Sequence, residues 1–378
     1  MKYILLLLVI TLLGCSSNKK QEMTSKLKIP VINLSKNVSS VPSLLLSEVA
    51  EKLEIVPLEM TDESVLSDIT EMQVTDHNIW IDHGREFYIY RFSRSGKFLN
   101  KIGSIGQGPG EYTTYSTFLV DEDKKEVYII ANTNGVLAYD FEGNFKRKIV
   151  DIQTILQLFS SVYDQYILNN QKFFATQNFA LYRPIDKDSL WSFVSLGDDF
   201  QKKKYFKNPA HVGKEELIIA NRANMDRMVN YWREYLTSMD TYNGQLTLKY
   251  PDTDTIYCYD DATNQLLPQY AIFTDEEKGD YEATHLWFKD RKAFDYFSIF
   301  SYYPTKDFIY LIGSKGEEVY TYCYNKKDGG VRLQKRQSAI NEQAVPWFSF
   351  PFLGMKRSFV LNNDLCGGDF TVDSRSSG

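Results

Sequence analysis

Histidine and cysteine are scarce in this sequence, and neither occurs at the spacings that bind transition metals. The four histidines are His77, His83, His211 and His285, and the four cysteines are Cys15, Cys258, Cys323 and Cys366. They form neither an H-E-x-x-H motif nor a C-x-x-C pair. No metal or other cofactor is therefore expected. Apart from Cys15, three cysteines allow at most one disulfide, so no disulfide framework is implied.

Motifs of several enzyme classes are missing as well. The G-x-S-x-G elbow of serine hydrolases does not occur. The glycine-rich run at 106–112 (GQGPGEY) matches neither G-x-G-x-x-G nor G-x-x-x-x-G-K-[ST]. We expect this run to be a loop between repeats, and no catalytic residue is assigned.

An excess of basic residues is also lacking. The 43 Lys and Arg residues are outnumbered by 49 Asp and Glu, which gives a net charge of -6. A nucleic-acid-binding surface needs a basic patch that neutralises phosphates, so nucleic acid is excluded as a partner. The one basic run, Lys202-Lys203-Lys204, is expected to be a solvated loop.

The N-terminus has the order of a bacterial export signal. A short positive start is followed by an apolar run over residues 4–13, which is too short to span a bilayer. The run ends in Leu12-Leu13-Gly14-Cys15, which resembles the lipobox of bacterial lipoproteins, where the cysteine receives lipid before cleavage. We expect residues 1–14 to be the signal peptide, Cys15 to be lipidated and residues 15–29 to form a polar tether.

This interpretation gives the location of the mature protein. It is expected in the cell envelope, anchored by lipid to the outer membrane, with the periplasmic face favoured over the cell surface. The alternative is an ordinary secretory peptide with an incidental cysteine, but the usual A-x-A cleavage pattern is absent.

Short strand-like runs begin near residue 69 and repeat. The composition is rich in Tyr (26) and Phe (24), which favour strands. Four runs lie at 69–74, 78–81, 86–92 and 97–102, and four more at 118–120, 126–130, 136–141 and 144–149. The last hairpins match closely, because Gly96 and Gly143 occupy the same turn position 47 residues apart. A four-stranded repeat of this length is typical of a propeller blade, with a β-sandwich as the alternative.

Later copies are less regular. A third blade is expected from runs at 172–176, 179–182 and 191–194, a fourth from 246–250, 255–260 and 267–270, and a fifth from 308–312, 318–325 and 331–333. A sixth would cover residues 347–373, closed by an N-terminal strand such as 53–58. Apolar residues from Met225 to Leu236 recur at helical spacing, so a helical insertion over about 213–240 is expected between the third and fourth blades. It would either cover one face of the propeller or pack outside the blades.

Three segments carry a resemblance to a known family. Residues 101–112 (KIGSIGQGPGEY), 254–259 (DTIYCY) with 267–270 (LPQY), and 363–368 (NDLCGG) are similar to those of six-bladed β-propeller lipoproteins of the Bacteroides type, relatives of NHL-repeat propellers. The resemblance implies an all-β propeller over residues 30–378, and the family has no assigned catalytic residues. Cys366 departs from the acidic residue usual there, and the short polar tail at 371–378 leaves the completeness of the last blade open.

Two smaller features allow more than one interpretation. The pairs Asp252/Asp254 and Asp260-Asp261 could hold Ca²⁺ at the propeller funnel, but turn capping explains them more simply. Cys258 and Cys323 take similar places in successive blades, which would hold them too far apart for a disulfide, so packed thiols are expected.

The functional hypothesis is a lipid-anchored binding or scaffold module, monomeric, for a peptide, a glycan or a partner protein of the envelope. The alternative is a hydrolase or lyase that acts on a sugar, lactone or peptide in the central funnel.

Overall fold

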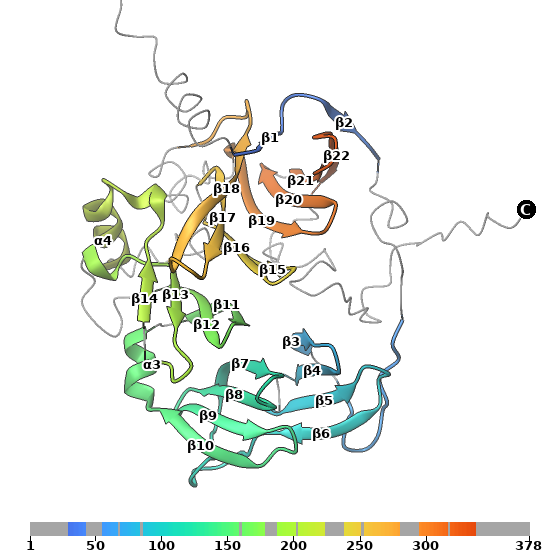
Figure 1. The fold of residues 1–378 in the computed structure, drawn as a ribbon, viewed down its shortest axis with the longest axis vertical. Helices are drawn as coiled ribbons and strands as arrows, with labels where there is room; N and C mark the ends of the chain where they lie inside the picture. Colours follow the sequence, from blue (N-terminus) through green and yellow to red (C-terminus); the bar gives the residue numbers. More distant parts are fainter. Residues whose placement is uncertain are drawn as a thin grey trace, which may run out of the picture. The chain divides into compact units, whose positions relative to one another are not determined.

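The computed structural model describes residues 29–42, 55–66, 69–83, 86–158, 161–177, 187–201, 203–223, 238–250, 253–279, 295–316 and 318–337. These residues form five sheets with few helices (Figure 1), and the sheets are antiparallel except for one parallel edge strand in each of two. They belong to two compact units. We number the sheets 1 to 5 in chain order, counted from β3 (Ile69–Val74). Sheets 4 and 5 lie in one unit (1–49, 186–192, 206–336), and sheets 1 to 3 lie in the other (50–185, 193–205, 337–378).

Each of the first three sheets is a four-stranded meander. Sheet 1 contains β3 (Ile69–Val74), β4 (Asn78–His83), β5 (Ile89–Ser93) and β6 (Phe98–Ile102). Sheet 2 contains β7 (Tyr115–Asp121), β8 (Glu126–Ala131), β9 (Gly135–Asp140) and β10 (Phe145–Val150). Sheet 3 contains β11 (Ser161–Leu168), β12 (Gln171–Gln177), β13 (Phe193–Leu196) and β14 (Lys203–Phe206). The helix α3 (Ile152–Leu158) connects sheets 2 and 3.

Sheets 4 and 5 each carry a fifth strand from the N-terminal segment. Sheet 4 contains β15 (Ser238–Tyr242), β16 (Gln245–Lys249), β17 (Thr255–Asp260), β18 (Gln265–Phe273) and β1 (Val31–Asn33). Sheet 5 contains β19 (Ser298–Pro304), β20 (Phe308–Lys315), β21 (Glu318–Asn325), β22 (Val331–Gln337) and β2 (Val38–Ser40). β1 pairs in parallel with β18 and β2 with β22, so one short segment covers the outer edge of two sheets (Figure 1).

The predicted repeat is confirmed in its best-preserved part. The eight runs expected in sheets 1 and 2 are strands β3 to β10. Gly96 and Gly143 have φ of 86° and 91° in the same hairpin position, and each donates its N–H to the carbonyl oxygen three residues earlier. A positive φ favours glycine, which explains why this residue recurs where the rest of the turn varies.

Both faces of the sheets are packed against other residues, which explains why many strand sequences are nearly continuous runs of apolar residues. Every residue of β8 is buried. The core between sheets 1 and 2 includes Trp80, Tyr112, Phe118, Ile129 and Tyr139, all almost inaccessible to solvent. Sheets buried on both faces require this pattern, whereas a sheet exposed on one face alternates.

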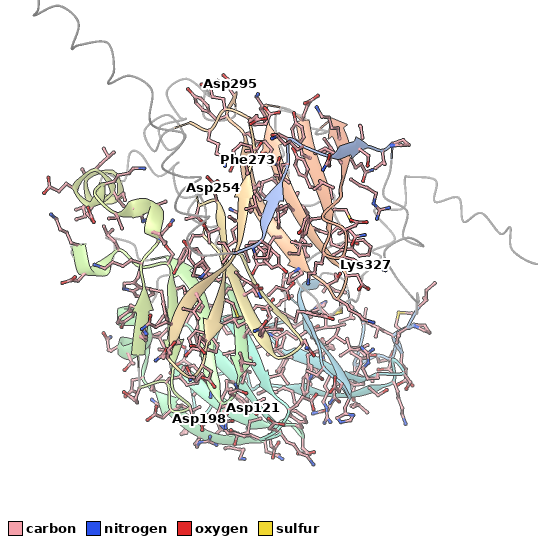
Figure 2. All side chains as sticks on the ribbon, turned by 45° about the horizontal axis from the view of Figure 1, so that its top comes forward. Asp121, Asp198, Asp254, Phe273, Asp295 and Lys327 are labelled. Carbon is pink, nitrogen blue, oxygen red and sulfur yellow. The ribbon has the colours of Figure 1, made fainter. Side chains whose placement is uncertain are left out.

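A buried cation joins sheets 2 and 3. Lys172 is inaccessible to solvent, and its Nζ donates to Asp198 Oδ1 at 2.6 Å and lies 4.9 Å from the centre of the Tyr128 ring. Lys124 pairs with both Asp121 and Asp198, which lie close together in Figure 2. Lys172 thus binds a carboxylate beside its own sheet 3 and contacts a ring of sheet 2, while Lys124 of sheet 2 binds Asp198 of sheet 3.

Three expectations about the strands were wrong or incomplete. Lys203 and Lys204 begin strand β14 instead of a solvated loop, and lysines suit such a strand because β14 is the edge of its sheet. The strands β11, β15 and β19 were not predicted. Residues 55–58 form no strand, since Pro57 has no N–H to donate.

Other predicted elements lie outside the described residues. These are the run at 179–182, the sixth blade over 347–373, and the helical residues Met225 to Leu236. The helix α4 (Glu215–Ala223) lies between β14 and β15, preceded by the 3-10 turns η1 (Lys187–Ser189) and η2 (Pro209–His211).

Candidate functional site

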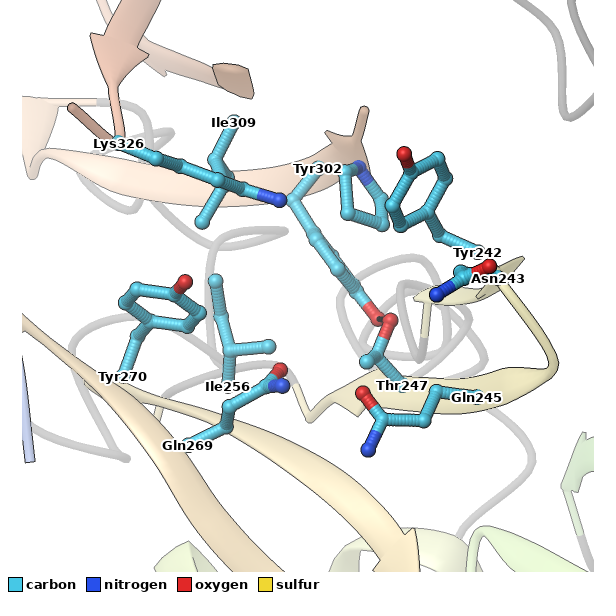
Figure 3. A pocket seen from close by; sticks show the side chains of 11 residues that line it. Tyr242, Asn243, Gln245, Thr247, Ile256, Gln269, Tyr270, Tyr302, Ile309 and Lys326 are labelled. Carbon is cyan, nitrogen blue, oxygen red and sulfur yellow. Dashed lines mark hydrogen bonds between the residues drawn. The ribbon is translucent and has the colours of Figure 1, made fainter. Parts of the chain in front are cut away.

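A pocket of about 170 Å³ lies on sheets 4 and 5, near the hairpin that joins β15 to β16 (Figure 3). We call it the Tyr242 pocket. Its lining residues are Tyr242, Asn243, Gln245, Thr247, Ile256, Gln269, Tyr270, Tyr302, Pro304, Ile309 and Lys326. Every one of them belongs to the same compact unit.

The floor of the pocket is part of the core between the two sheets. Ile256 and Ile309 are each 1% exposed. The hydroxyl of the buried Tyr302 donates to Thr247 Oγ1 at 2.7 Å. The floor is therefore apolar and held in place, which suits it to receive a ligand without rearrangement.

Amide side chains form much of the remaining wall. Within the described part of the chain, the side chains of Asn243, Gln245 and Gln269 make no hydrogen bond to protein. Asn243 and Gly244, with φ of 51° and 72°, form a two-residue turn that pairs Tyr242 with Gln245. The turn thus places the Tyr242 ring opposite the Gln245 amide in the pocket. An amide side chain can both donate a hydrogen bond to a ligand and accept one from it.

Lys326 supplies the charge of the pocket. It follows β21 and reaches across from sheet 5 towards the residues of sheet 4 (Figure 3). Its Nζ lies 5.3 Å from the centre of the Tyr242 ring and donates to the Thr305 carbonyl oxygen at 2.5 Å. Burial lowers the pKa of Lys326, and the nearby charge of Asp307 only partly opposes that effect.

A second polar constellation lies where the first strands of sheets 1, 2 and 3 approach one another. We call it the Glu71 cluster. The Glu71 carboxylate on β3 accepts hydrogen bonds from Gln73 Nε2 (2.7 Å), Gln165 Nε2 on β11 (2.5 Å) and Thr117 Oγ1 on β7 (3.1 Å). Both glutamines also donate to the Phe118 carbonyl oxygen. One carboxylate thus connects three sheets.

A second carboxylate lies opposite Glu71. Asp82 on β4 is its partner in the strand register and accepts a hydrogen bond from the Tyr115 hydroxyl at 2.5 Å. Burial raises the pKa of Glu71 to about 7, the charge of Asp82 adds to that effect, and the hydrogen bonds from Gln73, Thr117 and Gln165 oppose it. Burial and Asp82 also raise the pKa of Tyr115.

The residues that the sequence had marked for cation or phosphate binding have structural roles. Asp260 caps its own turn by accepting from Ala262 N and Thr263 Oγ1. Asp254 pairs with Lys278. In the loop at 106–112, Gly108 N–H donates to Glu111 Oε2 at 2.7 Å, so the protein's own carboxylate occupies the position of an anion.

The cysteines and histidines are dispersed. Cys258 and Cys323 are free thiols, the first partly and the second fully buried. Within the described ranges, no three His, Cys, Asp or Glu side chains are grouped to hold a metal ion. Cys15, Cys366, His285, Lys202, Asp252 and the lipidation motif lie outside those ranges.

Neither the Tyr242 pocket nor the Glu71 cluster was predicted. The Asn243-Gly244 dipeptide is a strong hairpin signal and would have located β15 as the partner of the expected run at 246–250. Glu71 lies in β3, whose alternating polar and apolar residues give no sign that Glu71 differs from the other polar positions. Only the packing of the strands shows that the first strands of three sheets meet at this residue.

Meandering four-stranded sheets whose first strands approach one another define an all-β protein with a propeller-like fold. The chain belongs to the family described as Domain of unknown function (DUF4934), whose model matches residues 29–361.

The chain is similar to several solved structures, the first of which supports the same fold. An exported protein of Bacteroides fragilis is 18% identical, with a TM-score of 0.56, and the match covers 81% of this chain and 80% of that one. A member of the DUF4221 family from Bacteroides vulgatus is 11% identical, with a TM-score of 0.46 and coverage of 75% and 84%. The extracellular domain of a hybrid two-component system from B. thetaiotaomicron is 12% identical, with a TM-score of 0.36 and coverage of 75% and 29%. No protein of curated function matches the chain.

No helix in the described part of the chain has the length and apolar character needed to cross a bilayer.

Proposed function

We propose that this protein is a lipid-anchored binding module of the cell envelope, attached through Cys15 and closed as a six-bladed propeller related to NHL-repeat proteins. In this proposal, residues 347–373 supply the sixth blade. A helical insertion separates the third blade from the fourth blade. The ligand is a small polar molecule or the exposed end of a glycan or peptide, bound in the Tyr242 pocket.

The observation that carries this proposal is the lining of the pocket. Three amide side chains that make no hydrogen bond within the described residues stand beside tyrosine rings over a rigid apolar floor. Asn243 and Gln245 are exposed and Gln269 is half-buried, so a ligand can reach these amides, while aromatic rings provide contact area at a low entropy cost.

The double variant Gln245→Ala/Gln269→Ala tests the pocket. We expect it to weaken binding of envelope glycans or peptides to the purified mature chain by about 5- to 150-fold, because each of the two lost hydrogen bonds contributes about 0.5–1.5 kcal/mol. Binding is measured by titration calorimetry after a glycan and peptide array has selected the ligand. Gln201→Ala, an exposed glutamine in the other unit, is the control and should leave affinity unchanged. Equal affinity of the double variant and the parent would refute the assignment of the pocket.

The second candidate, a hydrolase or lyase, is favoured by one specific observation. Glu71 and Asp82 form a pair of opposed carboxylates, and the pKa of Glu71 is raised into the range of a general acid at neutral pH.

Turnover assays test this candidate with chromogenic glycosides, lactones and peptides at pH 6 to 8. If the cluster is catalytic, the parent chain turns over one of these substrates and Glu71→Gln lowers kcat at least a hundredfold. Glu63→Gln, an exposed glutamate in the same unit, should retain full activity. The absence of turnover across the panel would remove this candidate.

A further inference from the structure

The charge on Lys326 is not balanced inside the Tyr242 pocket. Within the described residues, no carboxylate forms an ion pair with this side chain, whose only hydrogen bond from Nζ goes to the Thr305 carbonyl oxygen. Its other close partner is the face of the Tyr242 ring. Asp307 acts on Lys326 through its charge but forms no ion pair with it. A half-buried cation without a paired anion is costly to keep charged, and an anion brought to it recovers part of that cost.

The rest of the lining specifies the other parts of a ligand. The hydroxyl of Tyr270 and the amides of Gln245 and Gln269 offer both donors and acceptors. Groups of both kinds at several points match a ligand that has several hydroxyls. The volume of about 170 Å³ leaves room for a ligand of roughly one sugar ring.

We propose that the Tyr242 pocket binds a small hydroxyl-rich carboxylate, of the chemistry of a uronic acid, with the carboxylate on Lys326 Nζ and the ring hydroxyls on the amide and tyrosine side chains. This inference rests on the proposed binding function and specifies its ligand class. The C-terminus of a peptide shares the carboxylate but has no hydroxyls to engage the amides of Gln245 and Gln269.

The ion pair between Lys326 and the ligand carboxylate makes the affinity depend on salt and on pH, whereas the affinity for a neutral ligand would not show this dependence. Affinity falls as salt screens the attraction between Lys326 and the carboxylate. Affinity also falls at alkaline pH, because the carboxylate binds the protonated lysine and burial already favours its neutral form.

Titration calorimetry of the mature chain with glucuronate, galacturonate, glucose, galactose and N-acetylalanine tests the inference. We expect one of the two sugar acids to bind at least tenfold more tightly than its neutral counterpart and than N-acetylalanine, and to weaken between 20 and 300 mM salt. Lys326→Met should lose at least tenfold in affinity, whereas Lys326→Arg should retain most of it, since both cations pair with carboxylates.

Lys327→Met is the matched control. Lys327 is the next residue, is exposed (Figure 2) and does not line the pocket, so its loss removes the same charge from the chain without changing the site. Far-ultraviolet circular dichroism and Tm show whether each variant is folded. Should Lys326→Met not fold, the salt dependence and the acid-to-neutral ratio of the parent chain still decide the question.

The possible outcomes separate the two proposals. Equal binding of a sugar acid and its neutral form, or an unchanged affinity in folded Lys326→Met, overturns the ligand class, and so does tighter binding of N-acetylalanine. If a neutral ligand then binds and Gln245→Ala/Gln269→Ala abolishes that binding, the binding function remains and only the ligand class fails. If none of the five compounds binds, the ligand class is refuted and the array decides the binding function.

Discussion

Replacing Gly96 by alanine is expected to destabilise the chain by about 3 kcal/mol or more. Gly96 has φ of 86°, which an L side chain rarely adopts. A Cβ there would lie 1.9 Å from the carbonyl oxygen of Pro57, which is backbone and has no rotamer to relieve the contact. The segment at 55–60 would have to leave, with loss of the hydrogen bond from Glu59 N to Gly96 O. Urea unfolding measures the change.

Gly329→Ala separates the steric contact from backbone strain. Gly329 has φ of 72°, but a Cβ there meets no atom within 4 Å. This variant should therefore show the strain alone, about 1 kcal/mol. If both alanine variants lose the same stability, the contact between Gly96 and Pro57 has no energetic importance.

Replacing Glu71 by glutamine is expected to raise stability at pH 8 relative to pH 5, by about 1–3 kcal/mol compared with the parent chain. The pKa of Glu71 in the folded chain is raised from 4.5 to about 7, and each pKa unit corresponds to about 1.4 kcal/mol. The folded state therefore binds more protons than the unfolded state between these values. The parent loses stability as pH rises through this window, whereas a neutral glutamine does not titrate.

The variant preserves the hydrogen bonds of the cluster. A glutamine carbonyl oxygen can still accept from Gln73 and Gln165, and its amide can donate to Thr117 Oγ1. Thermal unfolding from pH 5 to 8 gives the comparison, with the exposed Glu63→Gln as the control that should follow the parent. If the stability of the parent and of Glu71→Gln changed equally between pH 5 and 8, folding would not raise the pKa of Glu71.

Sheets 1 and 2 could be predicted from the sequence because the patterns that indicate their strands and turns lie in neighbouring residues. In sheets 1 and 2, strand residues alternate with turns that contain Gly96 and Gly143, and both glycines have the positive φ that such hairpins require. Strand and hairpin formation in these stretches depends mainly on neighbouring residues, so the sequence pattern was sufficient.

Strands with little local apolar pattern were missed. β11 and β15 carry polar residues, and each forms because it pairs through a short hairpin with the strand that follows it. The short strands β1 and β2 were missed for a second reason: three residues carry little local signal, and their partners lie more than 200 residues away.

The sequence by itself determined the class of the protein: strand-rich, repeated, acidic, and without metal or nucleophile motifs. Only the tertiary structure decided where chemistry is possible. Lys326 became a candidate ligand-binding cation because β21 brings it across to Tyr242, and the pKa of Glu71 is raised to about 7 because three first strands, packed around its carboxylate, reduce its contact with water. Both effects depend on distance and dielectric environment, and these are set by packing between residues that are far apart in the chain.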